Sequence, residues 1–210
     1  MFIADQVHYN LGFTAASLRP DLARIIADAY LTTGDWASAK RVVLESNALQ
    51  CRSLKSAVRL ERELRQRLER LTDKELRLLS SSTGEARHLI AWLAVIKHIE
   101  FAYEFASEAL RAKIEAHDPV LRRSDYESFL VAKMRMHPEI ARLADSSRSK
   151  LKQVLLLMLT EVGLLVPGPA LGTISRAVLP NAVLQAIIDD DPRWLAGFLV
   201  PESEIGVERC

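Results

Sequence analysis

Hydrophobic residues recur every three or four positions along most of the chain, the spacing that places them on one face of an α-helix. Alternating hydrophobic and polar residues, which mark a half-buried strand, are rare. The clearest helical run is a series of leucines: Leu60, Leu64, Leu68 and Leu71. We predict one long helix over residues 52–71 from this run, and an all-α protein, a compact helical bundle, from the chain as a whole.

Residues that favour helix ends divide the chain into further helices. Proline suits the first turn of a helix, glycine suits the position after its last turn, and Ser, Thr or Asp can cap its first N–H groups. In the first half of the chain the predicted helices are 21–31 between Pro20 and Gly34, 36–45 after Asp35, a helix that starts with a capping box of Thr72 and Glu75, and one or two helices over 85–116. In the second half they are 125–136 after Ser124, a short helix from Pro138, a helix from Ser146 or Ser147 to Gly163, 180–189 and 192–199.

One segment departs from the helical pattern. The stretch LLVPGPALGTISRAVL combines prolines, glycines and β-branched residues, which favours a small β-hairpin near residues 164–178. We predict two regions on this basis, an N-terminal helical region over 1–120 and a winged-helix-like region over 121–210.

The apolar runs are too short for a membrane span. The longest, Val154–Val166, has 13 residues and contains Glu161, whereas a spanning helix needs roughly 20. The first ten residues show no secretion signal. The two cysteines, Cys51 and Cys210, have no zinc-site or disulfide spacing. We therefore expect a soluble, cytoplasmic protein in a reducing compartment.

The near-neutral total charge conceals local asymmetry. The chain has 28 basic and 27 acidic residues, but basic residues outnumber acidic ones over 52–70 and 142–152, and acidic residues dominate 185–210. Basic segments of this kind are the electrostatic signature of phosphate binding.

The first basic segment follows a helix and a short turn. Arg52, Lys55 and Arg59 are spaced to share one face of the predicted helix. The order helix, turn, basic helix is that of a helix-turn-helix, whose second helix enters the DNA major groove. We predict one such unit near residues 36–62.

The second basic segment has a similar setting. We predict a second helix-turn-helix unit over residues 125–178, with the hairpin as a wing after its basic helix. Backbone N–H groups at that helix start could also hold a phosphate. The candidate contacts are Ser146, Ser147, Arg148, Lys150 and Lys152.

Ordinary explanations exist for the same charges. Basic and acidic residues alternate over 62–70, and such mixtures usually form a solvated helix face, so we exclude that stretch from the predicted interface. The charged faces could instead contact other proteins, as in a helical adaptor, or bind RNA. Basic segments without interleaved aromatic residues argue against single-strand binding.

A set of short motifs resembles one known family. These motifs are Leu49-Gln50, Arg52-Ser53, Lys97-His98, Asp118-Pro119 with Leu121, Asp125-Tyr126 with Phe129, Ser146-Ser147-Arg148, Lys150-Leu151-Lys152-Gln153-Val154, Glu161 and Gly163-Leu164-Leu165. In their order and spacing, over about residues 20–200, the chain resembles the BrxA family of BREX bacteriophage-exclusion systems.

That resemblance implies an all-helical protein with helix-turn-helix elements, similar in fold to the antitermination factor NusB. It also implies binding to double-stranded DNA in a phage-defence system, with other BREX proteins as further partners. The family has also been catalogued as an inner membrane protein of unknown function, which conflicts with the short apolar runs. The resemblance supplies no residue assignment, so the contact residues above come from the charge pattern alone.

Signatures of catalysis are missing from the sequence. It has no phosphate-binding glycine loop, no nucleophile elbow and no paired histidines at metal-binding spacing. The run Asp189-Asp190-Asp191 reads as a solvated helix end, because consecutive carboxylates on a helix point in different directions. We therefore expect a non-enzymatic protein without cofactor or metal, and the sequence leaves its oligomeric state open.

Overall fold

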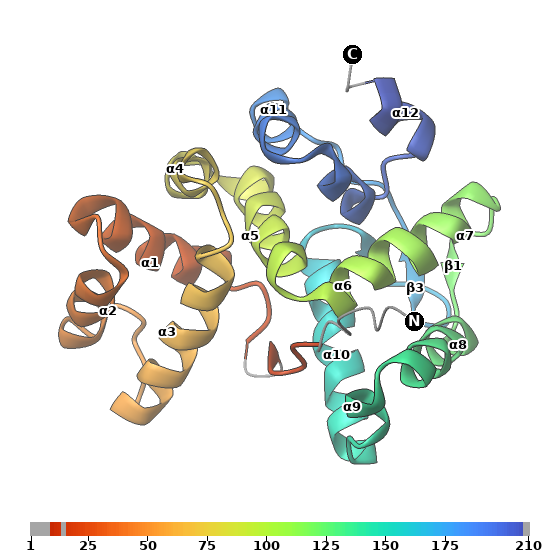
Figure 1. Cartoon of the computed structure of the whole chain (residues 1–210), viewed down its shortest axis with the longest axis horizontal. Helices are drawn as coiled ribbons and strands as arrows, with labels where there is room; N and C mark the ends of the chain where they lie inside the picture. Colours follow the sequence, from red (N-terminus) through yellow and green to blue (C-terminus); the bar gives the residue numbers. More distant parts are fainter. Residues whose placement is uncertain (1–8, 14–15, 208–210) are drawn as a thin grey trace, which may run out of the picture.

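The computed structural model describes residues 9–13 and 16–207, and one buried helix, α5 (Gly84–His98), lies at its centre (Figure 1). Every residue from Leu89 to Ile96 is buried. Trp92 is fully buried, and its indole N–H donates to the carbonyl of Gly197 at 3.0 Å. A helix that is hydrophobic on all sides belongs in a core, which explains the apolar run LIAWLAVI.

Helices α1–α4 form one side of the molecule, as Figure 1 shows for α1–α3. The predicted end residues of α1, α2 and α4 are confirmed: Gly34 follows α1 with φ 70°, the Asp35 carboxylate accepts the Ser38 N–H, and Thr72 and Glu75 form the capping box. Helix α3 is shorter at both ends than the predicted 52–71. The bounds are α1 Pro20–Thr33, α2 Trp36–Glu45, α3 Leu54–Leu68 and α4 Asp73–Ser81.

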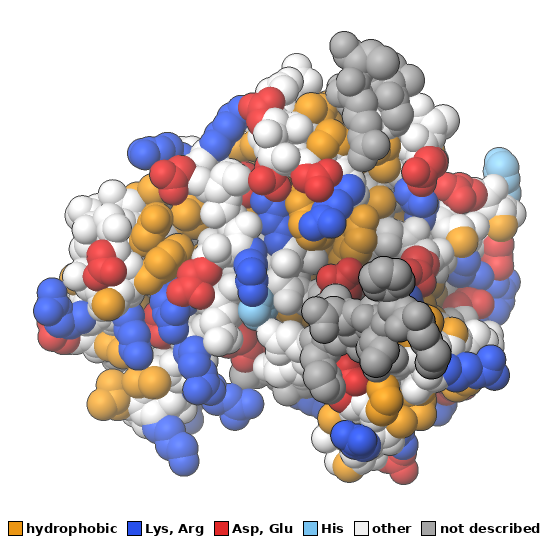
Figure 2. Space-filling model, in the orientation of Figure 1, with side chains coloured by type: hydrophobic (Ala, Val, Ile, Leu, Met, Phe, Trp, Pro, Cys, Tyr) orange, Lys and Arg blue, Asp and Glu red, His pale blue; other side chains and the backbone are white. Residues whose placement is uncertain are grey.

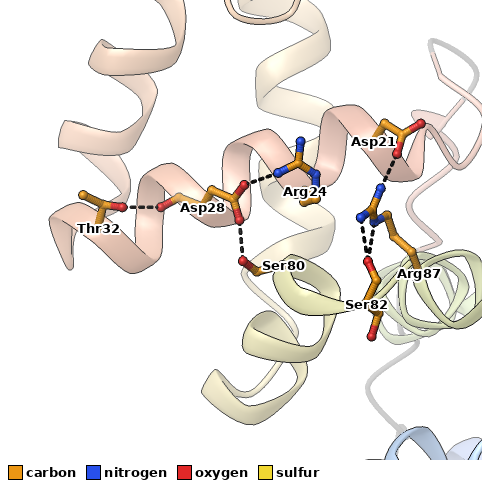
Figure 3. Close-up of polar contacts among 7 residues, drawn as sticks. All are labelled: Asp21, Arg24, Asp28, Thr32, Ser80, Ser82 and Arg87. Atoms are coloured by element: carbon orange, nitrogen blue, oxygen red, sulfur yellow. Dashed lines mark hydrogen bonds and ion pairs between the residues drawn. The ribbon is translucent and has the colours of Figure 1, made fainter. Parts of the chain in front are cut away.

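Polar contacts hold α1 against the α4–α5 junction (Figure 3). The Ser80 hydroxyl donates to Asp28, which also pairs with Arg24 at 2.6 Å. Arg87 on α5 pairs with Asp21 and donates to the Ser82 carbonyl. These contacts fix α1, and with it α2 and α3, relative to the central helix.

The predicted helical stretch 85–116 is broken after α5. Ile99 has an extended backbone (φ −121°), and the chain continues as α6 (Glu100–Glu104), a π-helical turn η2 (Phe105–Leu110) and α7 (Arg111–Glu115). Phe101 and Phe105 from this stretch pack edge-on against Phe129. The aromatic rings therefore join the central helix to the next group of helices.

That group consists of α8 (Arg123–Met136), α9 (Pro138–Ala141) and α10 (Asp145–Glu161). Our predicted start for α8 is wrong. Helix α8 begins at Arg123, because the Asp125 carboxylate accepts the Arg122 N–H at 2.6 Å, and Ser124 lies within the first turn rather than capping it.

A small antiparallel sheet follows α10. Its strands are β1 (Val120–Leu121), β2 (Leu165–Val166) and β3 (Gly172–Ile174), in the order β1-β3-β2. Val166 and Val120 both pair with Thr173. The predicted hairpin is confirmed as β2–β3, so the fold is all-α with a small β-hairpin. Strand β1 was not predicted, because it is only two residues long.

The C-terminal elements return to the centre of the molecule. They are α11 (Asn181–Asp190), the 3₁₀ turn η3 (Pro192–Phe198) and α12 (Glu202–Val207). Asp189 pairs with Lys74 at 2.5 Å and Asp190 with Lys97 at 2.8 Å. Asp189 and Asp190 lie exposed at the end of α11, as predicted, and their ion pairs also tie α11 to α4 and α5.

Across the described ranges, no helix combines the length and hydropathy that a bilayer crossing requires. The division into regions 1–120 and 121–210 stays a prediction, as does the likeness to NusB.

Candidate nucleic-acid interface

The first basic helix starts later than predicted. Ser53 caps α3 by accepting the Ser56 N–H at 3.2 Å, so the helix begins at Leu54. Arg52 therefore lies in the preceding turn, not on the helix face. Lys55 and Arg59 lie on the helix, and all three basic side chains are exposed.

The second basic helix starts earlier than predicted. Helix α10 begins at Asp145 after Ala144, and no side chain caps it. Ser146 and Ser147 lie exposed in its first turn, so the predicted serine cap is wrong. First-turn N–H groups have no intrahelical acceptor, and the uncapped start leaves them able to bind an anion.

The three cations of α10 have different surroundings. Arg148 pairs with Asp145 and donates to the Ala141 carbonyl at 3.2 Å, and its side chain is 27% exposed. Lys152 lies over the Tyr126 ring, 5.6 Å from the centroid. The Lys150 ammonium has one hydrogen-bond acceptor among the described residues, the Gln153 amide oxygen at 3.2 Å. Lys150 is therefore the α10 cation most available to a ligand.

One groove brings the two basic helices together. Arg59 of α3 and Lys150 of α10 line the same groove of about 600 Å³, with Arg19 and Cys51. Ser146, Ser147 and Lys150 line an adjoining hollow of about 270 Å³. Figure 2 shows Lys and Arg side chains gathered at the lower left, where Figure 1 draws α2 and α3. Arg52, Lys55, Arg148 and Lys152 line neither cavity.

The groove cations form no ion pairs with the described acidic residues. Over residues 9–13 and 16–207, no carboxylate oxygen lies within 4.0 Å of a charged nitrogen of Arg19, Arg59 or Lys150. The same holds for Arg52 and Lys55. These cations therefore keep the positive potential that attracts a polyanion.

Arg19 is an interface candidate that the sequence analysis missed. It is exposed and has a left-handed backbone, φ 47° and ψ 51°, just before α1. The pair Arg19-Pro20 carried part of the signal, because a residue before proline is kept out of the right-handed helical conformation. The rule favours an extended backbone, however, so the left-handed conformation of Arg19 and its place in the groove came only from the structure.

A short segment, Ala16–Leu18, links α3 to α10. Arg67 donates to the carbonyls of Ala16 at 2.9 Å and Ser17 at 2.7 Å, and the Leu18 N–H donates to Glu161 of α10 at 2.8 Å. We call this segment the strap. It holds the two basic helices in one relative position.

The buried charges on α3 correct our interpretation of residues 62–70 as a solvated face. Arg67 is 2% exposed and pairs with Glu63 at 2.7 Å. Burial raises the pKa of the Glu63 carboxyl, although Arg67 pulls it downward. Burial likewise lowers the pKa of the Arg67 guanidinium, although the neighbouring Glu63 carboxylate raises it. The acid–base alternation here builds an internal ion pair, which the spacing alone did not reveal.

Comparison with known proteins identifies the family. The family model described as BrxA matches residues 7–191. A curated relative, "BREX protein BrxA" of Escherichia coli O9:H4 (strain HS), is 26% identical over 141 residues, 67% of this chain and 66% of the relative. A crystal structure of an uncharacterized protein from Magnetospirillum magneticum is similar in fold, with a TM-score of 0.79 at 19% identity, covering 91% of this chain and 98% of that one. The chain belongs to the BrxA family.

Proposed function

We propose that this protein is a non-enzymatic duplex-DNA-binding component of a BREX bacteriophage-defence system. The observation that carries the proposal is the groove that Arg19, Arg59 and Lys150 line together, with no carboxylate partner among the described residues. The curated relative is named a BREX protein, which supports the setting. Other BREX proteins are further candidate partners.

The arrangement of helices supports a helix-turn-helix mode of binding. Helices α2 and α3 are joined by a short turn, and the exposed N-terminal end of α3 carries Lys55 and Arg59. The β2–β3 hairpin directly follows helices α8, α9 and α10. This is the position that a wing takes after the recognition helix of a winged helix-turn-helix. In this mode the N-terminal turns of α3 and α10 approach the DNA.

The proposal makes a quantitative prediction for salt dependence. We propose six cations as phosphate contacts: Arg19, Arg59 and Lys150 in the groove, and Arg52, Lys55 and Lys152 on the two basic segments. Neutralising about six phosphates gives a log–log slope of affinity against salt of about −5. Fluorescence anisotropy with a labelled duplex, from low to physiological salt, measures that slope. Absence of binding at low salt would leave the adaptor function as the better explanation.

Charge reversal in the groove tests the location of binding. We expect Arg59→Glu with Lys150→Glu to weaken duplex binding by at least tenfold, because two attractive contacts become repulsive. Arg77→Glu with Arg135→Glu changes the net charge equally at exposed sites that line neither groove cavity, so it should retain most of the affinity. Circular dichroism checks that both variants fold. Equal losses in the two variants would argue against the groove.

A competition assay distinguishes duplex-DNA binding from RNA binding. An unlabelled duplex should displace the labelled duplex at lower concentration than a structured RNA of the same length. The reverse order would assign the groove to RNA.

A further inference from the structure

A second basic cavity lies between α3 and the C-terminal end of α5. Its volume is about 330 Å³. Arg59, Arg62 and Gln66 line it from α3, His98 lines it from α5, and Asn10 closes it from the N-terminal segment. Arg59 also lines the groove described above, whereas the other four residues do not.

The charges around this cavity are unbalanced. Its described lining contains three arginines, Arg59, Arg62 and Arg67, and one carboxylate, Glu63. Glu63 is already engaged by Arg67 at 2.7 Å and by the Ala16 N–H at 3.2 Å. The exposed side chains of Arg59 and Arg62 have no carboxylate within ion-pair distance in the described part of the chain. Two cations are therefore free to bind an anion.

Two buried N–H donors add to the positive character. Arg67 Nε and His98 Nδ1 are buried and have no hydrogen-bond partner among the described residues, which is rare for buried polar atoms. The Asn10 carbonyl oxygen accepts the Gly12 N–H, so its amide nitrogen faces His98 Nε2, at 2.7 Å. His98 Nε2 therefore accepts the hydrogen bond from the Asn10 amide, and Nδ1 carries the ring hydrogen.

The same surroundings keep the His98 ring neutral. Burial lowers the pKa of His98, and the nearby charges of Arg70 and Arg67 lower it further, against the weaker opposing effect of Glu69. Glu69 is itself paired with Arg65. An anion placed among these cations would oppose their effect and raise the pKa of the ring.

We infer that this cavity binds a phosphate monoester, whose oxygens are held by the guanidinium groups of Arg59 and Arg62 and the amide of Gln66. Arginine offers paired donors that match the oxygens of phosphate. The cavity is larger than a lone phosphate ion, so it also has room for part of the group that the phosphate is attached to. A free nucleotide and the 5′ end of a DNA strand share this chemistry.

The test follows the His98 resonance by proton NMR in the full chain. Saturating adenosine 5′-monophosphate or a 5′-phosphorylated oligonucleotide should raise the pKa of His98 by about one unit, while the exposed His117 should not shift. His98→Gln assigns the resonance. The shift should vanish in Arg62→Gln and persist in Arg77→Gln, a matched control on α4 that lines no part of this cavity.

Comparing three ligands shows whether the phosphate monoester is a free nucleotide or the 5′ end of a DNA strand. A response to the 5′-phosphorylated oligonucleotide but not to its 5′-hydroxyl counterpart or to the free nucleotide assigns the cavity to a DNA end, and a response to the nucleotide assigns it to a free ester. If no phosphorylated ligand moves His98, or if Arg62→Gln responds as the unmodified protein does, the inference is wrong. Duplex binding by the groove is measured separately, so either proposal can fail while the other stands.

Discussion

Two arginines on α3 show how the same residue type takes opposite roles. Arg59 is exposed and lines two cavities, whereas Arg67 is 2% exposed and binds the strap and Glu63. Other buried charges behave like Arg67: Glu75 receives the Lys97 ammonium at 2.6 Å, and Lys133 is held by Glu104 at 2.8 Å. Charged residues are seldom fully buried without a partner, and each of these has one.

Loss of Arg67 should be costly. We expect Arg67→Met to reduce the free energy of unfolding by about 3 kcal/mol, because it leaves Glu63 and two strap carbonyls without their partner. Denaturant unfolding measures the change. Arg62→Met, an exposed arginine on the same helix, should stay within about 0.5 kcal/mol. Similar losses in both variants would mean that the buried pair contributes little.

At the scale of elements, the β2–β3 hairpin depends on one glycine. Gly172 has φ 135°, and a Cβ added there would lie 2.8 Å from the Val166 carbonyl oxygen and 2.9 Å from Leu165 Cγ. Such a conformation is open to glycine and disfavoured for other residues. Gly172 also pairs with Leu121 of β1, on the other edge of β3.

A substitution within the hairpin tests this requirement. Gly172→Ala should destabilise the protein by about 2–4 kcal/mol, from backbone strain and overpacking together. Gly168→Ala is the matched control in the same hairpin, since its Cβ would meet Thr173 Oγ1 at an acceptable 3.4 Å. Thermal or denaturant unfolding compares the two. A Gly172→Ala protein as stable as the control would show that the hairpin adapts without cost.

At the scale of the whole molecule, the groove exists because segments distant in sequence meet. Helix α1 is fixed on α4 and α5 (Figure 3), and the strap joins α3 to Glu161 of α10. Arg19, Arg59 and Lys150 then surround one space that also contains Cys51. The thiol is half-buried and unpaired, so it reports on whatever occupies the groove.

Cys51 provides a test of that assembly. In a Cys210→Ser background, duplex DNA should slow alkylation of Cys51 several-fold, because bound DNA covers the groove. Mass spectrometry of the modified protein follows the rate. The protection should disappear in the Arg59→Glu, Lys150→Glu variant. Unchanged alkylation under conditions where DNA is bound would place the ligand elsewhere.

Much of the fold was predictable because its signals are local. Pro20, Gly34, Asp35 and the Thr72–Glu75 capping box act within one helical turn, and the predicted helices near them are confirmed. Helix starts were predicted less exactly. Helix α3 begins at Leu54, two residues after the predicted start at Arg52, and α10 begins at Asp145, before the serines predicted to cap it. Boundaries of this kind shift by one or two residues because the first turn of a helix has weak local signals. The two-residue strand β1 has no periodicity that a sequence pattern could detect.

The candidate site, like the fold, was predictable only in part. By itself, the sequence determined the family resemblance, the helical class, the hairpin and the two basic segments. Capping, periodicity and local charge each depend only on residues within a short stretch of the chain. Only the tertiary structure decided which cations are available: it placed Arg59 beside Lys150, added Arg19, paired Arg148 with Asp145 and buried Arg67. The physical reason is that burial and ion pairing depend on which elements pack together, and no single segment of the chain contains that information.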